Sequence, residues 1–266
     1  MSILQFAAGA AAGTFALRER QARQSAERLA SALLETLLNA IDATDAETGA
    51  HVRRVAHYSL ILADAAELPA HASNVVERVA LFHDIGKISE ALFDIIHDDR
   101  ELSADERDAI ATHPARGADV LAPLDSFYPE LVAGVLSHHE RWDGTGYPQG
   151  LREAEIPLAA RIVSIADTFD AVTFARRYSA EQSSEVGAEV IAKGRGTQFD
   201  PDFADLFLCP PVFECIEDAR ARLCAPEPKR AERRSGQQEV TADLKFRWRS
   251  ATPPRPLPGL TRQKSR

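Results

Sequence analysis

The chain has 266 residues, 45% hydrophobic and 27% charged, which suits one large or two small globular domains and excludes a wholly disordered chain. Its formal net charge of −9 argues against a DNA-binding protein. The three cysteines, Cys209, Cys215 and Cys224, are too irregularly spaced for paired zinc hooks and do not form a disulfide framework, which favours a reducing compartment.

No stretch reaches the roughly 18 apolar residues that a membrane span needs. The closest candidate, Ile3 to Leu17, is short, rich in alanine and glycine, and followed rather than preceded by arginines. We therefore predict an N-terminal helix here, in preference to a membrane-associating segment, and a cytoplasmic protein.

Apolar residues recur at intervals of three and four along most of the chain, which predicts helices. Ser103 and Glu106 are spaced as a capping box, and Pro114 suits the first turn of a helix. The predicted helices cover residues 18–41, 48–68, 73–82, segments opening at 103 and 114, and residues 130–140, 158–169, 180–192 and 202–208. Three glycines and a proline make residues 143–150 a loop. No segment alternates with period two, so the predicted fold class is all-α.

The domain organisation follows from these patterns and a change in composition. We expect an N-terminal helical segment at 1–40, the main domain at 41–210, a further helix at 211–224 and a disordered tail at 225–266. The tail holds six prolines and 11 Lys or Arg against four Asp or Glu, a charge of +7, which leaves −16 for the preceding residues. Such a tail is either a solvated terminus or a segment that binds an acidic partner, RNA or a membrane surface.

Imidazoles and carboxylates stand at helix ends and on inward faces. His83-Asp84 and His138-His139 each end an apolar helix, His113 precedes the helix start at Pro114, and Asp167 follows an apolar run. Glu47 and His51 are four residues apart and share one helical face. Histidine together with carboxylate suits Mn, Fe, Zn or Ni, whereas Ca and Mg prefer oxygen ligands. A single such pair is weak evidence, but several at helix-length intervals indicate a metal site.

Two segments carry a specific resemblance: His83-Asp-Ile-Gly-Lys87 and His138-His-Glu-Arg-Trp-Asp-Gly-Thr-Gly-Tyr-Pro-Gln-Gly-Leu151. Together they resemble the HD-GYP family, a branch of the HD-domain metal-dependent phosphohydrolases. Residues 49–55, 113–117, 160–171 and 196–201 also resemble family segments, in the expected order over residues 41–207. The resemblance implies a helical HD domain with a Gly146-Tyr-Pro148 loop.

The resemblance also implies roles for individual residues. The implied metal ligands are Glu47, His51, His83, Asp84, His113, His138, His139 and Asp167. Asp84 would bridge the metals, and Glu47 falls where trinuclear members place an extra carboxylate. The implied catalytic residues are Asp84 and Lys87, and the implied substrate-binding residues are Lys87, Arg141, Arg176 and Tyr147.

The activity implied by the resemblance is hydrolysis of cyclic di-GMP to pGpG and, with a second cut, to GMP. Attack by a hydroxide that bridges two or three divalent metals, iron or manganese, would break the phosphodiester. The Gly146–Pro148 loop would also dock diguanylate cyclase domains. Two alternatives stay open: a non-hydrolytic module that binds nucleotide or a cyclase partner, and an HD phosphohydrolase for another nucleotide.

Departures from the family pattern keep these alternatives open. Asp98-Asp99-Arg100 stands where members have a basic Lys-Pro-Gly turn, Ala175 replaces an aspartate, and Arg177 replaces the proline before Tyr178. None of these changes removes an implied ligand, so we expect metal binding to survive and substrate preference to be the property affected. His57, His71 and His97 are expected in packing or solvated positions, and Trp142 either stacks on a guanine or orders the loop.

Overall fold

The computed structural model describes residues 3–88, 103–174 and 182–224, without the side chains of residues 3–17 and 44. The predicted tail at 225–266, the departures at 98–100, Ala175 and Arg177, and the predicted substrate residue Arg176 lie outside the described residues. His97 and Tyr178 also lie outside them.

The described residues form helices joined by turns and one long loop, and their only bridge is an isolated pair between Arg195 and Phe199. This confirms the predicted all-α fold. The α-helices are α1 (Ile3–Thr44), α2 (Ala46–Ala65), α3 (Ala70–Phe82), α5 (Ala104–Ile110), α6 (His113–Leu121), α7 (Pro129–Leu136), α8 (Leu158–Thr173), α9 (Ser184–Gly194), α10 (Pro201–Leu208) and α11 (Pro210–Cys224). Three short 3₁₀ turns accompany them: η1 (Ile85–Ile88), η2 (Ala122–Leu124) and η3 (Glu153–Glu155).

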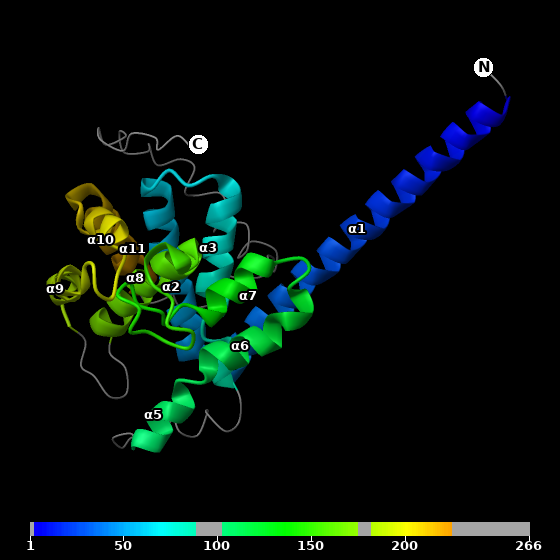
Figure 1. Cartoon of the computed structure of the whole chain (residues 1–266). Helices are drawn as coiled ribbons and strands as arrows, with labels where there is room; N and C mark the ends of the chain where they lie inside the picture. Colours follow the sequence, from blue (N-terminus) through cyan, green and yellow to red (C-terminus); the bar gives the residue numbers. More distant parts are fainter. Residues whose placement is uncertain (1–2, 89–102, 175–181, 225–266) are drawn as a thin grey trace, which may run out of the picture.

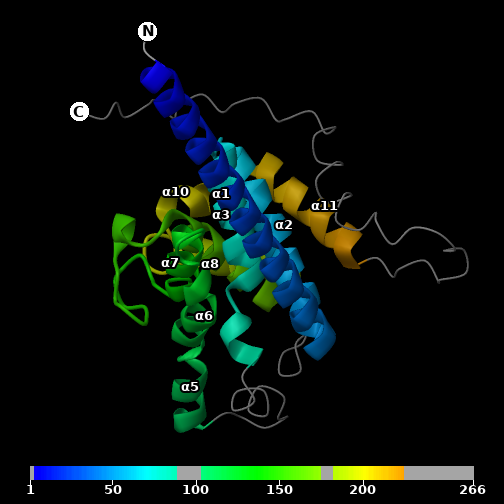
Figure 2. The ribbon, with the colours of Figure 1, turned by 90° about the vertical axis from the view of Figure 1, so that its right-hand side faces the viewer.

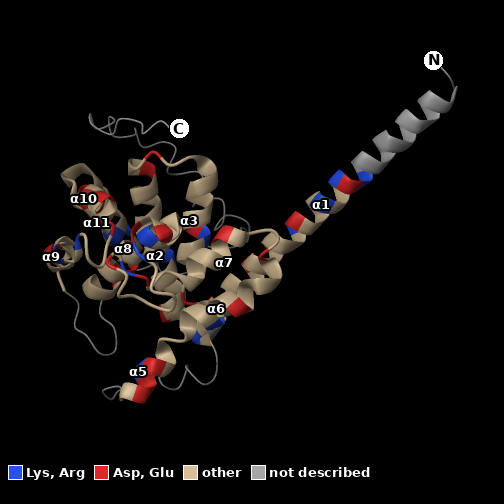
Figure 3. Cartoon of the chain, in the orientation of Figure 1, with Lys and Arg blue, Asp and Glu red and all other residues tan. Residues whose placement is uncertain are grey.

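The N-terminal helix α1 is one continuous element that leaves the helical body and points away from it (Figure 1). Its C-terminal half packs on the body through the buried side chains Ala30, Leu34 and Ile41. Farther out, basic and acidic side chains are mixed along its surface (Figure 3), with Arg23 paired to Glu27 one turn later at 3.0 Å. No helix among the described residues is long and apolar enough to cross a membrane.

The core lies where α2, α3 and α8 pack against one another, and α10 and α11 cover it (Figure 2). Phe169 of α8 stands at its centre, with Tyr58 of α2 and Phe207 of α10 packed edge-on at ring distances of 5.6 and 5.2 Å. All three rings are fully buried. This packing fixes α2 and α8 side by side, and both helices carry predicted metal ligands on their facing sides.

Local signals locate several helix ends. Ser103 and Glu106 form the predicted capping box at α5, and Pro114 lies in the first turn of α6. Two other expectations were wrong. Helix α7 ends at Leu136, because the chain turns at Ser137, whereas we predicted a helix to residue 140. Helix α3 begins at Ala70 and not at the predicted residue 73, so His71 lies in its first turn, where it is exposed.

Candidate metal centre

Several predicted ligands lie where the end of α3 meets the start of α6, whereas His51 and Asp167 lie within α2 and α8. His83 is the C-cap of α3 and Asp84 follows it, while His113 is the first residue of α6. Gly86 permits this meeting of η1 and α6, because a Cβ there would lie 2.1 Å from the His113 carbonyl oxygen. The motif therefore needs glycine two residues after the aspartate for steric reasons.

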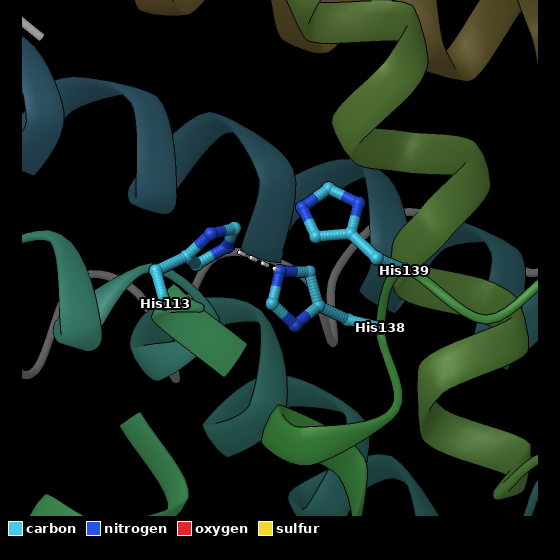
Figure 4. Close-up of side chains that lie close together, drawn as sticks. All are labelled: His113, His138 and His139. Atoms are coloured by element: carbon cyan, nitrogen blue, oxygen red, sulfur yellow. Dashed lines mark hydrogen bonds between the residues drawn. The ribbon is translucent and has the colours of Figure 1, made fainter. Parts of the chain in front are cut away.

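Six of these side chains form two groups, and the ligand atoms within each group lie within 4.8 Å of one another. The first group is His113, His138 and His139, whose rings converge from α6 and from the turn after α7 (Figure 4). The second group is His51 of α2, His83 and Asp167 of α8. The two groups are neighbours, since the ring centroids of His83 and His138 are 5.1 Å apart.

Asp84 lies between the two groups. Its Oδ1 is 3.3 Å from Nε2 of His113 in the first group. Its Oδ2 is 3.5 Å from Nε2 of His83 and 3.7 Å from Nε2 of His51 in the second group. One carboxylate oxygen thus faces each group, which is the arrangement that a carboxylate bridging two metals requires.

Backbone carbonyls fix the tautomer of three of the imidazoles. Nδ1 of His83, His113 and His138 each donates to the carbonyl three residues earlier, at 2.8, 2.7 and 2.7 Å. A carbonyl only accepts, so Nδ1 carries the proton and Nε2 presents a lone pair to the cluster. The same geometry recurs because each histidine lies at a helix end or turn, within reach of the carbonyl three residues before it.

Two observations show that this donor set fits a metal. The Nε2 atom of His83 is buried and has no hydrogen-bond partner in the structure. The Nε2 atoms of His113 and His138 are 3.1 Å apart, although both Nδ1 atoms already hold the ring protons. Two nitrogen lone pairs that face each other at this distance repel, and a cation bound between the two rings would offset that repulsion.

The protonation states also suit metal binding. Burial holds the pKa of His138 well below its usual value and lowers the pKa of His139 to about 4. Hydrogen bonds and nearby imidazoles outweigh burial and keep the pKa of Asp167 well below its usual value, and Lys87 leads the charges that do the same for Asp84. At neutral pH these histidines are therefore neutral and these aspartates ionised, which are the forms that bind metal.

Two other predicted site residues, Lys87 and Tyr147, contact this cluster, whereas Arg141 makes its contacts within the loop. Lys87 Nζ lies 2.7 Å from Asp84. Tyr147 stacks on His139 at a ring distance of 5.0 Å, and burial raises the pKa of its phenol to about 12. Arg141 donates to Thr145 on the surface of the loop.

Glu47 is the one implied metal ligand for which the structure gives no contact with the cluster. It is exposed in the first turn of α2 and belongs to neither of the two ligand groups. Its role as a third-metal ligand therefore stays a prediction.

Two buried carboxylates were missed by the sequence analysis. Asp170, one turn after Asp167 on α8, accepts from His51 Nδ1 at 2.7 Å. Its spacing of three from a predicted ligand was a usable signal. Glu140 accepts from the backbone N–H groups of residues 149, 150 and 151 at 2.6, 3.1 and 3.1 Å, and thereby holds the loop against the site. No local sequence pattern predicts that role.

Comparison with known proteins agrees with this geometry. A family model described as an HD domain matches residues 35–203. A 3′3′-cGAMP-specific phosphodiesterase of Vibrio cholerae is 34% identical over 178 residues, which cover 66% of this chain and 34% of that protein. A cyclic di-GMP phosphodiesterase response regulator of Xanthomonas campestris is 35% identical over 177 residues, which cover 66% of this chain and 46% of that protein. The chain thus spans less than half the length of these curated relatives.

A solved structure shares the fold. The crystal structure of a cyclic GMP-AMP specific phosphodiesterase from V. cholerae has a TM-score of 0.54 and 21% identity, covering 77% of this chain and 55% of that one. The resemblance to HD-GYP proteins drawn from the motifs is confirmed by these matches, and the chain belongs to the HD domain family.

Proposed function

We propose that this chain is a metal-dependent phosphodiesterase that hydrolyses a cyclic dinucleotide, with cyclic di-GMP as the first candidate substrate. The observation that carries the proposal is the position of Asp84, whose two oxygens face two separate groups of ligands. The printed names of the relatives, cyclic di-GMP and cGAMP phosphodiesterases, support the same class of substrate.

Two divalent ions, which we propose to be iron or manganese, would activate a water for attack and neutralise charge on the phosphate. The protein's own contribution is to hold the ligands ready, because the Nδ1 hydrogen bonds fix three imidazoles before any ion arrives. This preorganisation removes the cost of arranging the site during the reaction.

The positive charge that the substrate needs is local. Residues 1–224 carry −16, so this part of the protein repels an anionic dinucleotide, and a nearby cation has to offset the repulsion. Lys87 is the best placed, since its ammonium already lies at the cluster, 2.7 Å from Asp84. We propose that Lys87 stabilises charge on a phosphate oxygen and that Tyr147, stacked on His139, contacts the substrate at the rim. Arg141 would join it there on leaving its contacts with Thr145 and Asp143.

A panel of nucleotides tests the substrate. Protein loaded with Fe²⁺ or Mn²⁺ under anaerobic conditions is incubated with cyclic di-GMP, 3′3′-cGAMP, cyclic di-AMP and pGpG, and the products are resolved by chromatography and mass spectrometry. We expect cyclic di-GMP to be opened to pGpG fastest, and we expect the Asp84→Ala variant to be inactive while it keeps its helical content. Faster opening of another cyclic dinucleotide would reassign the substrate. Binding without any product in metal-loaded protein would favour the non-hydrolytic alternative.

We also propose that the Gly146–Pro148 loop docks a diguanylate cyclase domain. In support, Tyr147 is 37% exposed although one face of its ring lies on His139. A pull-down with a purified cyclase domain, repeated with Tyr147→Ala, tests this: we expect the variant to lose the partner, and equal capture by both would refute the proposal.

A further inference from the structure

The buried carboxylate of Asp170 lies beside the metal cluster without belonging to either ligand group. It is fully buried, and its Oδ2 lies 2.7 Å from Nδ1 of His51. Asp167, one turn earlier on α8, has its Oδ1 3.3 Å from Nε2 of the same ring. The imidazole of His51 is therefore held between two carboxylates of one helix, one on each ring nitrogen.

The two ring nitrogens of His51 face different surroundings. Nε2 faces the cluster, where Asp84 Oδ2 is 3.7 Å away, whereas Nδ1 faces Asp170. Asp170 thus lies on the side of the ring opposite the other ligands. A carboxylate in this position orients the ring and keeps the proton on Nδ1, which leaves the Nε2 lone pair for a metal. Its role differs from that of Asp167, which lies on the metal side.

Arg54 fixes Asp170 in turn. Its guanidinium grips both carboxylate oxygens, with Nε 2.7 Å from Oδ1 and Nη2 2.9 Å from Oδ2. Two parallel hydrogen bonds of this kind fix the orientation of the carboxylate as well as its charge. Arg54 follows His51 by three residues on α2, just as Asp170 follows Asp167 on α8. The two packed helices therefore present metal ligands on one turn and an ion pair on the next.

The same ion pair reaches the end of α8. The Arg54 guanidinium lies 3.7 Å above the centre of the Phe174 ring, the residue that follows α8. Arg220 of α11 lies 5.3 Å from that ring and donates to the carbonyl of Thr173 at 3.0 Å. Phe174 thus connects the ion pair to α11.

We propose that Arg54 and Asp170 are positioning residues, which together aim Nε2 of His51 at the metals and anchor the end of α8. The proposal rests on the metal centre of the proposed function and is independent of which dinucleotide is the substrate.

Metal affinity tests it directly. Metal-free protein is titrated with Mn²⁺, and the free ion is measured by electron paramagnetic resonance. Asp170→Asn keeps the shape of the side chain but removes its charge, and we expect Mn²⁺ affinity to fall roughly ten- to a hundred-fold. Asp200→Asn is the matched control: that carboxylate is also buried and pairs with an arginine, Arg161, at 2.8 Å, but it caps α10, a role that asparagine also fills. We expect the control to keep wild-type affinity.

The outcomes separate the two proposals. If wild-type protein takes up no Mn²⁺ or other divalent metal, the proposed function fails. If the wild type binds metal and Asp170→Asn binds it equally tightly, only the positioning proposal is overturned. Equal weakening in Asp200→Asn would also overturn it, because loss of any buried ion pair would then explain the effect. If Asp170→Asn does not fold, Arg54→Lys tests the proposal instead, because it keeps the positive charge but not the bidentate hydrogen bonds to Asp170. Undiminished Mn²⁺ affinity in that variant refutes the proposal.

Discussion

Glu140 is the side chain that holds the Gly-rich loop in place, and replacing it with glutamine should release that loop. Its Oε1 accepts from the N–H groups of Gln149 and Gly150, and its Oε2 accepts from Leu151. The side chain is 3% exposed, so water does not compensate for a lost bond. A glutamine offers one carbonyl oxygen, which can serve Gln149 and Gly150, but its NH₂ group then faces the N–H of Leu151.

The expected loss of free energy that holds the loop closed has two parts. Leaving the Leu151 N–H unsatisfied costs about 1–3 kcal/mol, and the two remaining bonds lose the charge that strengthened them, another ~1 kcal/mol. Since 1.4 kcal/mol is tenfold in an equilibrium constant, a total of about 2–4 kcal/mol raises the population of the open loop by roughly 30- to 700-fold. Backbone carbonyls fix the tautomers of His113 and His138 independently of Glu140, so metal uptake should stay close to wild type.

Amide hydrogen exchange at Leu151 measures this opening. Glu155→Gln is the matched control, because Glu155 lies in the same region, is exposed, and accepts a single backbone N–H from Arg152 at 3.1 Å. We expect Leu151 to exchange at the wild-type rate in the control and much faster in Glu140→Gln. Unchanged exchange at Leu151 in Glu140→Gln would show that the carboxylate does not hold the loop.

Three further predictions follow from the cluster. Lys87→Met should leave metal content unchanged and lower kcat for phosphodiester hydrolysis roughly 10²- to 10³-fold, the effect of losing one donor that stabilises charge in the transition state. An unchanged kcat would show that Lys87 has no catalytic role. In the metal-free protein, the pKa of His139 is about 4, below its unfolded value, so the unfolded chain binds more protons as pH falls. The contribution of neutral His139 to folding stability is therefore complete above about pH 6.5 and is lost as pH falls toward 4. The raised pKa of His51 acts in the opposite direction. The midpoint of thermal unfolding should therefore fall less in His139→Gln than in wild type over this range, and equal slopes would contradict the assignment. Glu47→Gln should lower bound metal by one equivalent and slow breakdown of pGpG more than ring opening; wild-type stoichiometry and rates would show that the centre is dinuclear.

Much of the fold was predictable because its signals are local. Periodicity located the helices, and the Ser103–Glu106 capping box and Pro114 marked two helix starts through contacts within one turn. Ends that depend on packing were less predictable. Helix α7 ends at Leu136 although the following residues could continue its pattern, and that early end is what turns His138 and His139 toward the cluster.

The residues of the candidate site also differ in how readily the sequence predicts them. His83, Asp84, His138 and His139 stand in motifs whose chemistry is readable from neighbouring residues. The two supporting carboxylates act over long sequence separations or through the backbone: Asp170 holds a histidine 119 positions away, and Glu140 binds N–H groups that every residue except proline possesses. Only the folded chain shows which partners such residues have.

The most direct test of the account is to locate the metals. Crystals of protein purified without air, measured at the absorption edges of iron and manganese, should show a pair of anomalous peaks about 3.5–4 Å apart, in addition to any third peak at Glu47. One peak should lie beside His113, His138 and His139, and the other beside His51, His83 and Asp167, with one oxygen of Asp84 directed at each. A single peak, or peaks that Asp84 does not bridge, would contradict the bridged pair of metals on which the proposed function depends.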